Sequence, residues 1–229
     1  MELFLYLYQH PKDVKLAFIF AHPDDESLST GGTIARYSAS GHMVSTLCLS
    51  SSEVRTREYL EATKILGVHK PRILNYANVV DFEGEIKNDL FKFLLEFRPE
   101  IVVTHLSDDY HIDHRVSYQI VREGIEWVAH ETQFDDAHLV SKLYVSETTV
   151  LIPNPHILVD ISPYYEIKEE AIRCYSSQLS KGGEGFYINF HKYRTHMRGT
   201  QASTDHAEAF LQVPLKKNSP FYKIKHSEL

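Results

Sequence analysis

Two short segments of this 229-residue chain concentrate the side chains that could perform chemistry. The first, Ala21-His22-Pro23-Asp24-Asp25-Glu26, directly follows an apolar run at residues 16–20. The second, Asp108-Asp109-Tyr110-His111-Ile112-Asp113-His114, comes shortly after another apolar run at residues 101–104. Imidazoles and carboxylates beside a buried strand are costly unless a cation neutralises them. The two segments therefore predict a metal site.

Three of these side chains form a candidate ligand set for one ion. His22 and Asp25 lie three residues apart in the first segment, and His114 would come from the second. Nitrogen and oxygen ligands that leave one position for water are typical of a catalytic zinc site, although iron(II) accepts the same ligand types. We expect Zn²⁺ here, with Fe²⁺ as the other candidate.

The remaining polar side chains suit supporting roles in catalysis. Asp24 would lie beside the ion without binding it, which suits a general base for a bound water. His111 would donate a proton or a hydrogen bond on the far side of the ion. Asp113 could orient one of the imidazoles, although an aspartate just before a helix is also a good N-cap. Both readings of Asp113 stay open at this point.

Strands and helices alternate along the first 130 residues. The apolar patterns predict strands at residues 15–20, 43–49, 72–74 and 101–104, and helices at 30–40, 53–66, 86–97 and 113–129. This alternation is typical of an α/β fold with a doubly wound, mostly parallel sheet and helices on both faces. The first and fourth strands are neighbours in the common strand order, so the two polar segments would meet at their carboxyl ends. One domain, residues 1–229, is expected.

The C-terminal half has weaker patterns. Residues 143–145 and 157–161 are predicted to be edge strands, and residues 164–175 a helix. Residues 178–185 contain three glycines and are predicted to form a mobile lid. Residues 213–229 indicate no particular structure.

Composition excludes several classes of function. The formal net charge of -7 argues against nucleic-acid or anionic-membrane binding, which needs a basic surface. The sequence has only two cysteines, which argues against a disulfide framework, and no apolar run near the ~18 residues of a membrane span. We expect a cytoplasmic protein that acts on a small molecule.

The two polar segments resemble the signature motifs of the PIG-L/LmbE-like family of zinc-dependent de-N-acetylases. Other parts of the chain are also similar to that family: Arg55 and Glu58 before Leu66-Gly67, Lys168 to Gln178, and Ala207-Glu208-Ala209-Phe210. The resemblance extends from residue 15 to about residue 210. It implies a Rossmann-like fold and hydrolysis of an N-acetylated amino sugar or sugar conjugate.

The resemblance also bears on individual residues. It implies the roles given above for the three ligands, for Asp24 and for His111, and it adds Arg55 as a residue near the substrate. The resemblance is also compatible with a homo-oligomer. Residues 50–53 replace a longer, glycine-containing loop of the family, so substrate choice is expected to depend on residues 50–55 and 178–185.

Two other functions remain open from the sequence. One is an amidase that acts on a different conjugate, such as a thiol or antibiotic conjugate, at the same metal centre. The other is a non-catalytic Rossmann-like binding module in which the carboxylates only cap loops. Bound metal separates the enzymes from the module, and the identity of the released acid separates the two enzymes.

Overall fold

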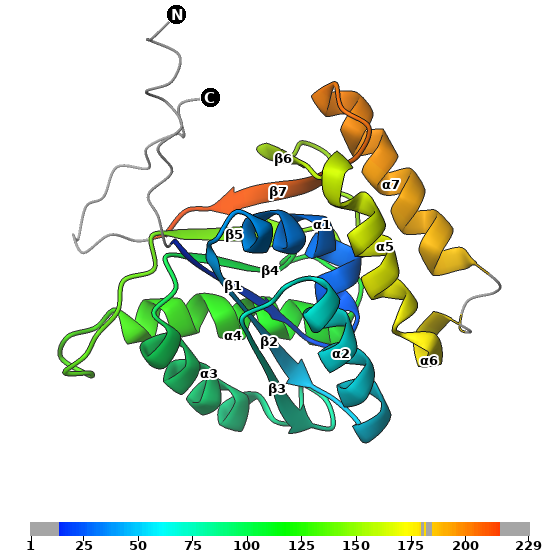
Figure 1. Ribbon diagram of the computed structural model, residues 1–229. Coiled ribbons are helices and arrows are strands. Elements are labelled where there is room, and N and C mark those ends of the chain that lie inside the picture. Colours follow the sequence, from blue (N-terminus) through cyan, green and yellow to red (C-terminus); the bar gives the residue numbers. More distant parts are fainter. Residues whose placement is uncertain (1–13, 180, 182–184, 216–229) are drawn as a thin grey trace, which may run out of the picture.

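A seven-stranded sheet crosses the computed structural model, which describes residues 14–179, 181 and 185–215 (Figure 1). The strands are β1 (Lys15–Phe20), β2 (Met43–Ser50), β3 (Lys70–Tyr76), β4 (Ile101–His105), β5 (Lys142–Ser146), β6 (Ile157–Asp160) and β7 (Ala207–Val213). The α-helices are α1 (Asp25–Ala39), α2 (Glu53–Ile65), α3 (Glu83–Phe97), α4 (Ile112–Val128), α5 (Tyr165–Arg173), α6 (Ser176–Leu179) and α7 (Phe186–Ala202), and one turn of 3₁₀ helix, Ser162–Tyr164, precedes α5.

The strand order is β3-β2-β1-β4-β5-β7-β6. The first five strands in this order pair in parallel, and β1 lies between β2 and β4 as predicted. Chain order reverses between β1 and β4, which is where ligands bind in sheets of this kind. The predicted α/β fold is confirmed.

The prediction that residues 143–145 form an edge strand was wrong. β7 pairs antiparallel with β5, from Leu143 opposite Val213 to Ser146 opposite Phe210, so that β5 is an interior strand. β7 also pairs antiparallel with β6, which is the edge strand on this side. The sequence patterns did not identify β7, whose insertion between two earlier strands changes their positions in the sheet.

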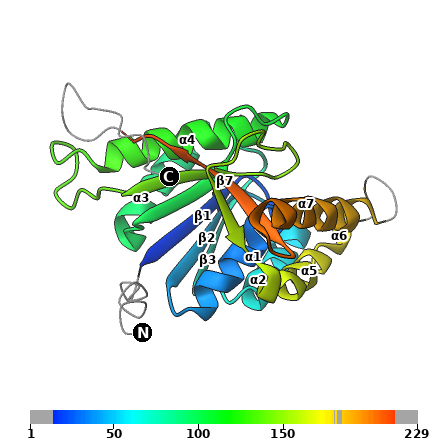
Figure 2. The ribbon, with the colours of Figure 1, turned by 90° about the horizontal axis from the view of Figure 1, so that it is seen from above.

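Helices cover both faces of the sheet (Figure 2), and an apolar cluster lies between the helices and the sheet on each face. α3 and α4 cover one face, where Ile86, Phe93 and Ile120 are buried in the same cluster as Ile19 of β1. α1, α2 and α5 cover the other face around Phe18. Both faces of the parallel strands are therefore buried, which explains the nearly continuous apolar strand sequences.

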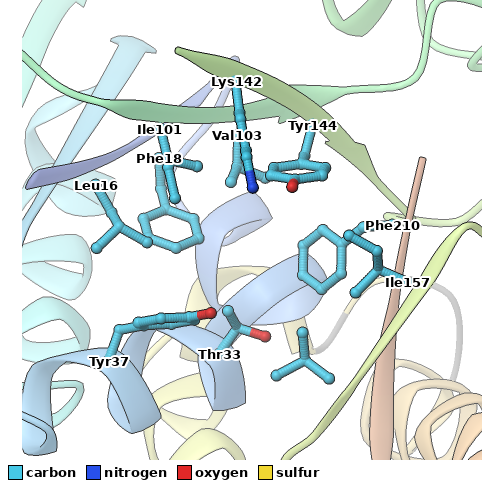
Figure 3. A pocket seen from close by; sticks show the side chains of 11 residues that line it. Leu16, Phe18, Thr33, Tyr37, Ile101, Val103, Lys142, Tyr144, Ile157 and Phe210 are labelled. Carbon is cyan, nitrogen blue, oxygen red and sulfur yellow. The ribbon is translucent and has the colours of Figure 1, made fainter. Parts of the chain in front are cut away.

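An apolar pocket of about 140 Å³ lies on the second face of the sheet, near the amino ends of β1, β4 and β5 (Figure 3). Phe18, Tyr144 and Phe210 contribute rings to its lining, and Lys142 points into it from β5. Its lining residues include no carboxylate and no histidine. This pocket therefore lacks the groups that hydrolysis at a metal ion requires.

Helix α1 begins at Asp25, five residues before the predicted start, and breaks at Thr30, which has non-helical φ and ψ angles of -137° and 15°. The break leaves the Leu28 carbonyl free to accept a hydrogen bond from Lys168 Nζ at 2.8 Å. It also frees the N–H groups of residues 32 and 33, which donate to the Glu208 carboxylate at 3.1 and 2.8 Å. Because Lys168 also pairs with Glu208 at 2.5 Å, α5 and β7 together fix the start of α1.

Gly32 lies where α1 packs closely against Ile161, in the chain after β6. A Cβ atom at this position would lie 2.6 Å from Ile161 side-chain atoms. Gly32→Ala is expected to lower the free energy of unfolding by about 1–3 kcal/mol, measured by urea denaturation. Gly84→Ala in α3 is the matched control, because its Cβ would meet nothing within 4 Å, and it should be neutral or slightly stabilising. Equal stability of the two variants would contradict this packing.

None of the helices in the described part of the chain is both long and apolar enough to cross a membrane.

Candidate active site

The first polar segment forms a tight turn at the carboxyl end of β1. The His22 N–H donates to Asp25 Oδ2 at 2.8 Å, which closes the turn. Asp24 has a φ angle of +112°, a region that residues other than glycine rarely adopt. Its N–H donates to Glu26 at 3.2 Å, and Glu26 is itself held by the hydroxyls of Ser27 and Tyr175. The buried Glu26 thus anchors the turn that presents Asp24 and Asp25.

Asp25 lies between the two predicted histidine ligands. Its Oδ2 atom is 3.3 Å from His22 Nδ1, and its Oδ1 atom is 3.4 Å from His114 Nε2. Two ligand atoms at 2.0–2.1 Å from one tetrahedral ion lie roughly 3.3–3.4 Å apart. The spacing and chemistry of these donors therefore fit a bound divalent cation, and the cluster is a possible metal site.

Two overlapping groups of side chains in the described residues could hold an ion. One is His22, His111 and His114, and the other is Asp25, His105 and His114. The predicted ligand set takes two members of each group and shares His114 with both. The structure therefore brings the predicted ligands together, while their assignment as ligands remains a prediction.

His105 is the last residue of β4. It is fully buried, its Nε2 accepts the Ala21 N–H at 2.9 Å, and its Nδ1 lies 3.2 Å from the Thr148 hydroxyl. It also lies 3.3 Å from Asp25 and stacks on His114 with ring centroids 3.8 Å apart. Because its Nε2 lone pair already accepts a backbone N–H, His105 supports the cluster and links β4 to the β1 turn.

The cluster strongly favours positive charge. Burial alone would lower the pKa of His22 and His114, but hydrogen bonds with Asp113 and Asp25 raise that of His22 to about 9. The charge of Asp25 and the contact with Asp109 raise that of His114 to about 10. Burial would raise the pKa of Asp25, yet the neighbouring His114 and His105 hold it well below its usual range. A site that stabilises protons on its imidazoles in this way also stabilises a cation.

Asp24 is the carboxylate suited to accept a proton. Burial and the adjacent Asp25 charge raise its pKa to about 8, against the opposing effect of Arg55. Arg55 pairs with Asp24 Oδ1 at 2.9 Å and also donates to the Pro23 carbonyl. A buried carboxyl whose pKa lies near neutrality has the affinity for protons that a general base needs. Because Arg55 pairs with the Asp24 carboxylate, it orients this side chain. Arg55 also lines the polar cavity over the cluster.

His111 is the N-cap of α4, and its Nδ1 accepts the Asp113 N–H at 3.2 Å. Burial and the nearby His22 lower its pKa, so a neutral ring with its proton on Nε2 is favoured. His111 can then donate a hydrogen bond into the site. The alternative reading of Asp113 as the N-cap was wrong, because Asp113 lies in the first turn and its Oδ2 is 2.9 Å from His22 Nε2.

A polar cavity of about 260 Å³ opens over this cluster. Its lining residues are His22, Asp24, Asp25, Leu28, Arg55, Tyr110, His111, His114, Thr148, Thr149, Gln178, Lys181, Tyr187 and His191. Of the two regions expected to govern substrate choice, Arg55, Gln178 and Lys181 line it, whereas residues 50–52 do not. Residues 180 and 182–184 of the predicted lid lie outside the described residues, so the lid stays a prediction. Sequence patterns also missed the contributions of residues 148–149 and of Tyr187.

Both polar segments lie within a match to a known protein family. Residues 17–125, which include both polar segments, match the PIG-L family, described as GlcNAc-PI de-N-acetylase. A probable N-acetyl-alpha-D-glucosaminyl L-malate deacetylase 2 from Bacillus anthracis is 26% identical over 184 residues, which cover 71% of this chain and 80% of the relative.

Two solved structures share most of the fold. The N,N'-diacetylchitobiose deacetylase from Pyrococcus horikoshii has a TM-score of 0.77 at 25% identity, with 93% of this chain and 89% of that chain covered. A conserved protein from Thermus thermophilus has a TM-score of 0.81 at 25% identity, with 92% of this chain and 99% of that chain covered. These similarities agree with the α/β fold described above.

Proposed function

The chain belongs to the PIG-L family of de-N-acetylases, and on that premise we propose that it is a zinc-dependent hydrolase of an N-acetylated amino sugar or sugar conjugate. It removes the acetyl group and releases acetate and a free amine. The observation that carries the proposal is the arrangement around Asp25: two imidazoles share this carboxylate, with Asp24 and His111 lining the same cavity.

His22, Asp25 and His114 hold the zinc ion in this proposal. When bound, zinc lowers the pKa of a coordinated water to about 7 and polarises an acyl oxygen. Asp113 keeps His22 oriented through the 2.9 Å contact, and Asp109 does the same for His114 at 3.2 Å. Such partners of metal-binding histidines fix the ring orientation and strengthen binding.

Asp24 and His111 carry the proton transfers. Asp24 removes a proton from the attacking water, and Arg55 holds its carboxylate in place for that step. His111 donates from Nε2 to the carbonyl oxygen as negative charge develops on it, which is worth roughly 2.7–4 kcal/mol for one such donor. Asp24 can then return its proton to the leaving nitrogen as the amide bond breaks.

We propose further that the enzyme works in the cytoplasm on a small molecule. Cys48 and Cys174 are both free, which suits a reducing compartment. The cavity is a polar recess of about 260 Å³, a size suited to part of a small substrate.

An acetate-release screen tests the function. The zinc-loaded protein is incubated with N-acetylglucosamine, its oligomers, its glycosides and nucleotide-linked N-acetylated sugars, and acetate is measured enzymatically. Release of acetate from at least one of these is expected. Release of a larger acid from other amide conjugates, with no acetate from any sugar, would favour the amidase alternative and contradict the proposal.

A further inference from the structure

His191 of α7 is a buried polar side chain that the steps above do not use. It is only 1% exposed, and neither of its ring nitrogens has a hydrogen-bond partner in the described part of the chain. Buried polar atoms in native proteins are nearly always paired, and an unpaired one is costly. His191 also lines the polar cavity above the metal cluster. An unpaired side chain at this wall therefore points to a ligand that pairs with it.

The state of the imidazole limits what that ligand can be. Burial and the nearby cations Arg194 and Lys168 hold the pKa of His191 well below its usual range, although Asp25 opposes them. The ring is thus neutral and offers one N–H donor and one nitrogen acceptor. A hydroxyl group can pair with whichever of these nitrogens faces the cavity, because it both donates and accepts, whereas an anion only accepts and an ammonium group only donates.

The position of His191 is firmly fixed. Arg194, one turn further along α7, donates to the Leu28 carbonyl at 2.6 Å and to the Glu147 carbonyl at 3.0 Å. These bonds attach α7 to the start of α1, the helix that carries Asp25. The imidazole is therefore held at a set position relative to the predicted metal ligands, as a substrate-binding side chain requires.

We propose that His191 binds substrate by hydrogen bonding to a hydroxyl group on the amino-sugar ring, and so selects sugars over other acetamides. This inference rests on the proposed function for the identity of the ligand. His191 belongs to neither group of side chains that could hold the metal, so its role concerns recognition and not the ion.

Deoxy analogues of the best substrate from the acetate screen provide the test. The wild-type protein should show a KM about tenfold higher for one ring-deoxy analogue than for the parent, the loss expected for one hydrogen bond. His191→Phe should raise the KM for the parent by a similar factor and remove this preference, with kcat changed less. His191→Gln, which keeps a donor and an acceptor, should retain part of the preference. His196→Gln, an exposed histidine of the same helix outside the cavity lining, is the control and should behave as wild type.

A purely structural role for His191 would lower activity on the parent and on every analogue equally, which would overturn the inference. The inference would also be overturned if the wild-type protein hydrolysed every ring-deoxy analogue as well as the parent sugar. That measurement needs no variant. Calorimetric binding of N-acetylglucosamine separates this inference from the proposed function. Binding that weakens about tenfold in His191→Phe, without acetate release by any form, would support His191 and reject deacetylation. Absence of binding, or equal binding by both forms, would overturn the role of His191.

Discussion

Asp24→Asn is expected to lower the kcat of acetate release by about 10²- to 10⁴-fold while the protein still binds zinc. The substitution preserves size and removes only the ability to accept a proton. Asp24 is not one of the predicted ligands, and its carboxylate is held by Arg55 at 2.9 Å. Zinc content and kcat measured on the same sample separate loss of the base from loss of the metal.

Asp108→Asn is the matched control for this variant. Asp108 is an exposed aspartate in the second polar segment and does not line the cavity, so its amide should leave kcat and zinc content unchanged. A fully active Asp24→Asn protein would reject the assignment of Asp24 as the base. Loss of zinc together with activity would instead make Asp24 part of the metal site.

Asp25→Asn is expected to weaken zinc binding more than any substitution of a surrounding partner does. Asp25 is the only carboxylate predicted to bind the ion, and its oxygens lie 3.3 and 3.4 Å from His22 and His114. An asparagine lacks the negative charge that stabilises the ion between these imidazoles. We expect a loss of more than about 100-fold in zinc affinity, measured by competition with a chromophoric chelator.

Asp109→Asn is the comparison variant, for which a smaller loss of zinc affinity is expected than for Asp25→Asn. Asp109 Oδ1 lies 3.2 Å from His114 Nδ1, on the side of the ring away from the Asp25 contact at Nε2. Removing such an orienting partner typically weakens metal binding by about 10- to 100-fold. If Asp25→Asn bound zinc as tightly as Asp109→Asn, Asp25 would not be a ligand.

The sequence allowed the arrangement of β1 to β4 and their helices to be predicted well, because this half consists of alternating apolar runs and amphipathic segments. It did not reveal the early start of α1. The break at Thr30 depends on Lys168 and Glu208, which lie more than 130 residues further along the chain. These contacts also give a physical reason for two of the segments that resemble the family, the helix containing Lys168 and the strand containing Glu208.

The C-terminal elements were harder to predict because they bury charge. In β7, Glu208 is only 2% exposed. Glutamates usually lie on the protein surface, so this residue argued against a buried strand. In α7 the buried face carries His191, Arg194 and Arg198, so an apolar stripe is lacking. Arg198 pairs with the buried Glu147, a contact that no local pattern indicates.

The site itself was only partly predictable. The sequence signal was clear for His22, Asp25 and His114. Each lies in a segment where several ionisable residues follow a predicted strand, a pattern that indicates a site. His105 and His191 are single histidines at a strand end and within a helix. For His105, the signal was its place at the carboxyl end of β4, beside the strand that carries the first polar segment. For His191, only the three-dimensional position shows that it reaches the cavity.

A metal ion held by His22, Asp25 and His114 is the central requirement of the proposed mechanism. The purified protein is stripped with a chelator, titrated with Zn²⁺, and assayed for acetate release at each step. We predict no release from the stripped protein and recovery that saturates at about one zinc ion per chain, as expected for a single catalytic site. Full acetate release by protein shown to be free of metal would contradict the proposed metal-dependent mechanism.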